Sequence, residues 1–176
     1  MGKSLREPDF RNPWGYYEDT DFAELNKIQI DTPDTEYRFL WKLKELASRR
    51  VEPWGVKSPE ISHLINLYRV AFPDARWIWV RRKYTSTVKS LKKNWGDQVP
   101  YIERLAEIRR GYLLRDLPGH ARHMVYEDFQ ANPEKEIQML ASWANADPGR
   151  CSDAVAFVKS EEDKRNEALK KNSPTA

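Results

Sequence analysis

The chain has 176 residues, 40% of them hydrophobic, and its 30 basic residues against 27 acidic ones leave a net charge of +3. This length fits one domain with a single core, and the small net charge argues against a nucleic-acid-coating surface. Apolar runs are too short to span a membrane, and no apolar leader opens the chain. With Cys151 as the single cysteine and only three histidines, we expect a cytoplasmic protein without disulfides or a metal site.

The first half of the chain predicts helices that alternate with short strands. Residues 32–34 (Thr-Pro-Asp) and 58–60 (Ser-Pro-Glu) each combine a capping side chain, a proline and an acid, which is a helix-start signal. Residues 54–57 and 77–80 are the extended candidates, the second rich in aromatic and β-branched residues. Apolar residues at helical spacing follow the two signals: Phe39, Leu43, Leu46 and Ala47, then Ile61, Leu64, Ile65, Tyr68 and Phe72.

The second half of the chain continues the alternation. Residues 98–116 read as a helix that Pro118-Gly119 ends, and a short strand is expected over 123–126. Asn132-Pro133-Glu134 starts a further helix, with apolar Ile137, Leu140, Ala141 and Ala144. This order predicts one α/β domain over residues 1–160 with a parallel sheet. The charged residues 161–176 are expected to be a frayed helix or disordered.

Polar side chains gather where each predicted strand ends. Lys57 closes the first strand, residues 81–83 (Arg-Arg-Lys) close the second, and residues 126–128 (Tyr-Glu-Asp) close the third. Ligands bind at the carboxyl ends of parallel strands, where helix N-termini favour anions. Arg82 and Ser90 are about two helical turns apart and can reach one phosphate. The alternative interpretation is that residues 81–83 form only a solvated strand exit.

Four segments carry a family pattern in order along the chain. They are residues 12–19 (NPWGYYED), Lys57-Ser58-Pro59, residues 72–75 (FPDA) with Arg82 and Ser90 behind them, and residues 125–134 (VYEDFQANPE). Together they resemble the sulfotransferases that use 3′-phosphoadenosine 5′-phosphosulfate, over roughly residues 10–145. Where that family has Arg-Asp-Pro, this chain has Arg82-Lys83-Tyr84.

The resemblance implies a three-layer, P-loop-NTPase-like fold with a parallel sheet flanked by helices. It also implies transfer of a sulfuryl group from 3′-phosphoadenosine 5′-phosphosulfate to a hydroxyl of a small molecule or glycan, without a metal. Arg82 and Ser90 would then hold the 3′-phosphate of the donor. Lys57 would lie near the transferred sulfuryl group or the substrate, and Glu18 would be a candidate general base for the acceptor hydroxyl.

The family's first strand and phosphate-binding loop should precede residues 12–19, so we expect a fold truncated at the N-terminus. Gly2-Lys3-Ser4 matches the end of a Walker loop, but it lacks the spacer and strand and reads as a coincidence. A second hypothesis is therefore a non-catalytic protein of this fold that binds another anionic ligand or a protein. An open sheet edge would need a cover, and we expect a homodimer or a partner chain to supply it.

Overall fold

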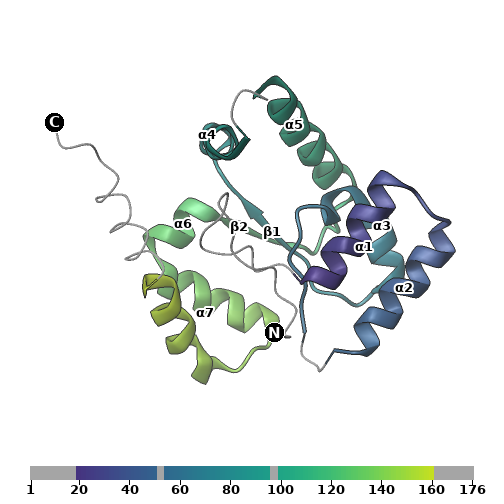
Figure 1. Cartoon of the computed structure of the whole chain (residues 1–176). Helices are drawn as coiled ribbons and strands as arrows, with labels where there is room; N and C mark the ends of the chain where they lie inside the picture. Colours follow the sequence, from purple (N-terminus) through teal and green to yellow (C-terminus); the bar gives the residue numbers. More distant parts are fainter. Residues whose placement is uncertain (1–18, 51–53, 96–98, 161–176) are drawn as a thin grey trace. The chain divides into compact units, whose positions relative to one another are not determined.

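The computed structural model describes residues 19–50, 54–95 and 99–160, which form a mostly helical α/β structure with a small parallel sheet (Figure 1). Its elements are, in chain order, α1 (Thr20–Asp31), α2 (Glu36–Ser48), α3 (Ile61–Ala71), β1 (Ile78–Arg81), α4 (Tyr84–Trp95), α5 (Val99–Asp116), β2 (Arg122–Val125), α6 (Tyr126–Ala131), α7 (Pro133–Ala144) and the 3-10 turn η1 (Pro148–Arg150). Residues 151–160 are also helical. None of the described helices combines the length and apolar composition needed to cross a bilayer.

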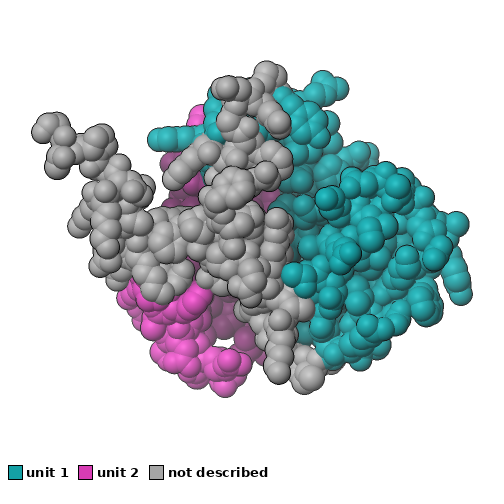
Figure 2. Space-filling view, in the orientation of Figure 1, with its two compact units in different colours: residues 1–77, 87–120 teal, residues 78–86, 121–176 magenta. Residues whose placement is uncertain are grey.

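The chain divides into two compact units, shown in different colours in Figure 2. The first unit contains residues 1–77 and 87–120, and the second contains residues 78–86 and 121–176. The prediction of one domain over residues 1–160 remains a prediction. The expected charged tail, residues 161–176, lies outside the described residues.

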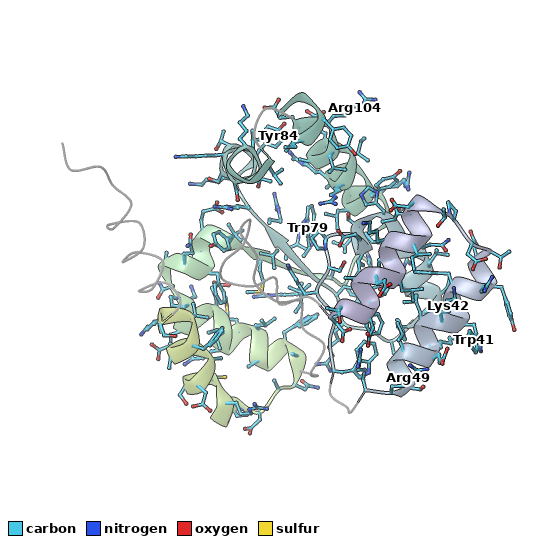
Figure 3. All side chains as sticks on the ribbon, in the orientation of Figure 1. Trp41, Lys42, Arg49, Trp79, Tyr84 and Arg104 are labelled. Atoms are coloured by element: carbon cyan, nitrogen blue, oxygen red, sulfur yellow. The ribbon has the colours of Figure 1, made fainter. Side chains whose placement is uncertain are left out.

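The first unit is built on a core that α1, α2 and α3 share. Phe39 and Leu43 on α2 are 1% and 0% exposed, so the predicted apolar face of this helix is confirmed. Trp41 of the same helix points away from that core (Figure 3) and is 57% exposed. Helix α5 packs on α3. The buried members of the core are Phe22, Leu25, Phe39, Leu43, Leu64, Tyr68 and Ala71.

The second unit contains the sheet, in which β1 and β2 pair in parallel with Ile78 opposite Arg122 and Arg81 opposite Val125. The strands predicted at 77–80 and 123–126 are therefore confirmed, with bounds displaced by one residue. Helix α6 contacts β2 and packs on α7. Within the described residues the sheet has two strands.

The strand predicted over residues 54–57 is wrong, because this segment forms neither strand nor helix. Its alternating apolar side chains pack on the core of the first unit instead of marking a sheet position. The Trp54 ring stacks on Phe22, with 5.6 Å between ring centroids, and meets the edge of Phe72 at the same distance. Val56 packs against the same core. Side-chain packing thus holds a segment whose backbone joins no strand.

The third predicted strand also ends earlier than expected, because Tyr126 begins α6. Glu127 and Asp128 lie in the first turn of this helix. Carboxylates are favourable there because the unpaired N–H groups and the dipole of a helix place positive charge at its N-terminus. The acids that the sequence places at a strand end thus begin a helix.

The predicted helix starts are close to the observed ones. Thr32 ends α1 through its N–H bond to Ile28, so the next helix begins later, with Thr35 as its cap. Residues 58–60 form the turn before α3, and Asn132 with Pro133 begins α7 as predicted. The helix predicted over 98–116 is confirmed as α5. Helix α1 was not predicted from the sequence.

Candidate functional site

Two side chains leave the carboxyl edge of the sheet next to each other. Because Arg81 lies opposite Val125 in the parallel register, the next residues, Arg82 and Tyr126, leave the two strands at the same level. The Arg82 guanidinium carbon lies over the Tyr126 ring, 4.9 Å from its centroid. A guanidinium over an aromatic face is attracted by the ring quadrupole. The ring therefore orients the Arg82 side chain.

Glu127 joins the same two chain segments through the backbone. Its Oε1 accepts a hydrogen bond from the Lys83 N–H at 3.1 Å, which ties the turn after β1 to the first turn of α6. Its Oε2 is buried and has no hydrogen-bond partner within the described structure. The carboxylate thus fixes the backbone next to Arg82, while Tyr126 fixes the guanidinium.

Arg82 is exposed at this edge. Across the described ranges, no carboxylate lies within ion-pair distance of its guanidinium, and Glu127 is occupied by a backbone N–H. Arginine presents a planar set of donors that fits a phosphate or sulfate group in a bidentate manner. The arrangement is that of an oriented cation at the end of a parallel strand, suited to binding an anion.

Lys57 is exposed on the segment between residue 54 and α3. The next residue, Ser58, is held by hydrogen bonds on both sides. Its Oγ accepts from Asn26 Nδ2 at 3.4 Å and lies 2.6 Å from Glu60 Oε2. Asn26 is in turn bonded to the Tyr68 hydroxyl at 2.8 Å. Lys57 thus extends from a segment that hydrogen bonds connect to α1 and α3.

The sequence predictions identified Lys57 but missed Asn26, Tyr68 and Glu60 as parts of its surroundings. Tyr68 was predicted only as one of the apolar positions of its helix. The signal that could have indicated Asn26 is its spacing from Phe22 and Leu25, which places an amide on the buried side of a helix. Without the partner helix in view, an amide at that position gives no reason to expect a specific contact.

The remaining predicted site residues lie elsewhere. Ser90 is half-buried in the second turn of α4. Glu18 lies outside the described residues; the residue that follows it, Asp19, caps α1 and pairs with Arg50 at 2.9 Å. Lys57 and Ser90 belong to the first unit, and Arg82 belongs to the second.

Comparison with known proteins identifies a family to which the chain is similar. A family model described as "Sulfotransferase family" matches residues 6–147, which is well over half of the chain. The searches of curated proteins and of solved structures gave no match. The matched range contains the parallel strands, the oriented Arg82 and the segment that carries Lys57. The chain belongs to the sulfotransferase family.

Proposed function

We propose that this protein transfers a sulfuryl group from 3′-phosphoadenosine 5′-phosphosulfate to a hydroxyl of a small molecule or glycan. Membership of the family implies a sulfonate donor. The observation that carries the proposal is the exposed Arg82 guanidinium, oriented by Tyr126 at the carboxyl end of a parallel strand. Ligands of open parallel sheets bind at this end of the strands.

The donor carries a 3′-phosphate and a 5′-phosphosulfate, and different residues are proposed to bind each of these two anionic groups. Arg82 binds the 3′-phosphate through a bidentate, charge-assisted pair, and the Ser90 hydroxyl adds a hydrogen bond to the same phosphate. Both residues fit an anion by their chemistry, and Arg82 is a permanent cation whose charge no described carboxylate neutralises. The three-layer, P-loop-NTPase-like arrangement of the sheet is part of this proposal, and the parallel pairing of β1 with β2 supports it.

The reaction is a displacement at sulfur. The acceptor oxygen forms a bond to sulfur while the bond between sulfur and the 5′-phosphate oxygen breaks, and the leaving phosphate takes the electron pair. Glu18 accepts the proton of the acceptor hydroxyl, and Lys57 stabilises the negative charge that develops on the leaving oxygen. Such a displacement needs positioning, a base and a cation more than a covalent intermediate.

Calorimetric binding of 3′-phosphoadenosine 5′-phosphate tests the proposal. Arg82→Ala should weaken this binding by about 10- to 100-fold, as expected for loss of a charge-assisted hydrogen-bonded pair. Binding of adenosine 5′-phosphate, which lacks the 3′-phosphate, should change little. Arg81→Ala is the matched control, because the Arg81 guanidinium lies over Trp79 at 5.5 Å instead of over Tyr126.

Two results would contradict the proposal. One is the absence of heat when the wild-type protein meets about 1 mM nucleotide, a concentration at which even a weak site binds. The other is an equal loss of affinity in the Arg81→Ala and Arg82→Ala variants, which would indicate a general effect of surface charge. Transfer of labelled sulfate to a panel of hydroxyl acceptors would then identify the acceptor class.

A further inference from the structure

We propose that Asn26 and Tyr68 are positioning residues for Lys57, acting through a buried chain of hydrogen bonds that fixes the segment on which Lys57 stands. The role of Lys57 in catalysis rests on the proposed function. The effect of the hydrogen-bond chain on the segment around Lys57 does not depend on it. The chain runs from the Tyr68 hydroxyl through Asn26 and Ser58 to Glu60, with distances of 2.8, 3.4 and 2.6 Å.

The direction of every bond follows from the last acceptor. An ionised carboxylate only accepts hydrogen bonds, so the Ser58 hydroxyl donates a hydrogen bond to Glu60. The Ser58 oxygen can then only accept from Asn26, which turns the amide nitrogen toward Ser58. The amide oxygen therefore faces Tyr68, whose hydroxyl donates to it. Each hydrogen bond in the chain is therefore donated in the direction of Glu60. Hydrogen bonds aligned in this way polarise one another, which strengthens each of them.

Burial makes this chain costly to break. Asn26 is 0% exposed and Tyr68 is 3% exposed. Burial raises the pKa of the Tyr68 hydroxyl far above its ordinary value, against the opposite effect of the Asn26 hydrogen bond, so the hydroxyl stays protonated and remains a donor. A buried amide that loses its partner loses far more than the net value of one exposed hydrogen bond. The chain is thus a single arrangement rather than one of several.

The segment that it holds lies outside the helices and strands. Residues 54–58 form neither helix nor strand, so no ladder of backbone hydrogen bonds fixes them. Val56 packs on the core and Ser58 enters the hydrogen-bond chain, so both neighbours of Lys57 are anchored on the protein side. Lys57 itself is exposed. Loss of the anchor at Ser58 would release the backbone from which Lys57 extends.

Tyr68→Phe tests the inference, because it removes one hydroxyl and keeps the ring in the core. Tyr101→Phe is the matched control, since Tyr101 is 65% exposed on α5. We expect Tyr68→Phe to accelerate amide hydrogen exchange at Ile61, Ser62 and His63, whose N–H groups donate to the carbonyls of residues 58–60, by at least about fivefold, because it leaves the buried Asn26 amide oxygen without its donor. Exchange in α7 should match the wild type, which separates a local effect from general unfolding. An unchanged exchange rate at these three amides overturns the inference.

A double variant tests whether the chain acts as a unit. Tyr68 and Ser58 are linked through Asn26 in this chain, so Tyr68→Phe combined with Ser58→Ala should accelerate exchange no more than the larger single change. Effects that multiply would contradict a connected chain.

Kinetic measurements distinguish a failure of this inference from a failure of the proposed function. Tyr68→Phe should lower kcat about fivefold and leave the affinity for 3′-phosphoadenosine 5′-phosphate within about twofold, because Arg82 is untouched. An unchanged kcat overturns the positioning role. If the wild-type protein transfers no sulfuryl group, the proposed function fails, and the exchange experiment still decides whether the chain fixes the segment.

Discussion

The guanidinium carbon of Arg82 lies 4.9 Å from the centroid of the Tyr126 ring, at the point where the two parallel strands end. Neither residue belongs to the sheet, yet the register of the sheet brings them together. The ring covers the face of the guanidinium, and within the described residues no carboxylate pairs with its N–H groups. The same two chain segments are joined again by the bond from Lys83 to Glu127.

Replacing the Tyr126 ring should therefore reduce nucleotide affinity without removing any charge. We expect Tyr126→Leu to weaken binding of 3′-phosphoadenosine 5′-phosphate about two- to fivefold, the value of an exposed cation–π contact of about 0.5–1 kcal/mol. Tyr126→Phe keeps the aromatic face and should bind within about twofold of the wild type. Calorimetry measures both, and an equal loss in the two variants would assign the effect to the hydroxyl instead.

Glu127 should contribute to stability through its bond to the Lys83 backbone. Glu127→Ala removes the acceptor of this exposed N–H, and we expect a loss of about 0.5–1.5 kcal/mol in the free energy of unfolding. Glu127→Gln keeps an acceptor oxygen and should lose less. Asp128→Asn is the control, because Asp128 is exposed in the same first helical turn. Urea denaturation measures all three; a Glu127→Ala variant as stable as the control would refute this role.

Two side chains of α2 should differ strongly in how much they contribute to the free energy of unfolding. Phe39 is 1% exposed, so Phe39→Ala should lower the free energy of unfolding by about 3–5 kcal/mol. Trp41, two positions along the same helix, is 57% exposed, and Trp41→Ala should change it by no more than about 0.5 kcal/mol. Chemical denaturation of both variants checks the contrast, which a similar loss in each would disprove.

His63 should make stability depend on pH. Burial lowers its pKa, Arg109 lowers it further, and Glu60 acts in the opposite direction. The neutral ring accepts a hydrogen bond from Arg109 Nε at 3.3 Å and packs against Tyr112. The unfolded chain therefore binds a proton more readily, and stability should fall as the pH drops below the ordinary His pKa of 6.5.

The variant His63→Gln keeps an acceptor for Arg109 and cannot titrate. Its stability should fall less than that of the wild type when urea denaturation is repeated at pH 7.5 and at pH 5. Parallel losses in the two proteins would show that other groups cause the pH dependence.

We also expect self-association through the outer side of β1. Ile78 and Val80 are 45% and 56% exposed and lie on the same side of the strand. A two-stranded sheet is marginally stable alone, and a second copy would cover this side. Light scattering at about 50 µM, well above the dissociation constant of an ordinary stable dimer, should give twice the 20.8 kDa mass of the chain. Val80→Lys should return the single mass, and Val70→Lys on α3 should not.

Periodicity and local chemistry were sufficient for α2, α3, α5, α7 and the two parallel strands, but not for α1. The apolar spacing of α2, the Asn-Pro start of α7 and the aromatic and β-branched β1 are properties of neighbouring residues, so they can be read along the chain. The same reading was wrong for residues 54–57, because an alternating pattern records which side chains are buried and does not record whether a strand lies alongside.

The sequence by itself determined the composition of the site: a lysine before a helix start and an arginine at a strand end. What only the tertiary structure decided is how these cations are held. The ring over Arg82, the carboxylate on the Lys83 backbone and the amide of Asn26 beneath Ser58 are contacts between residues at least 32 positions apart. Hydrogen bonds and ring contacts depend on distance and direction in space, and the order of the residues leaves both open until the helices and strands pack.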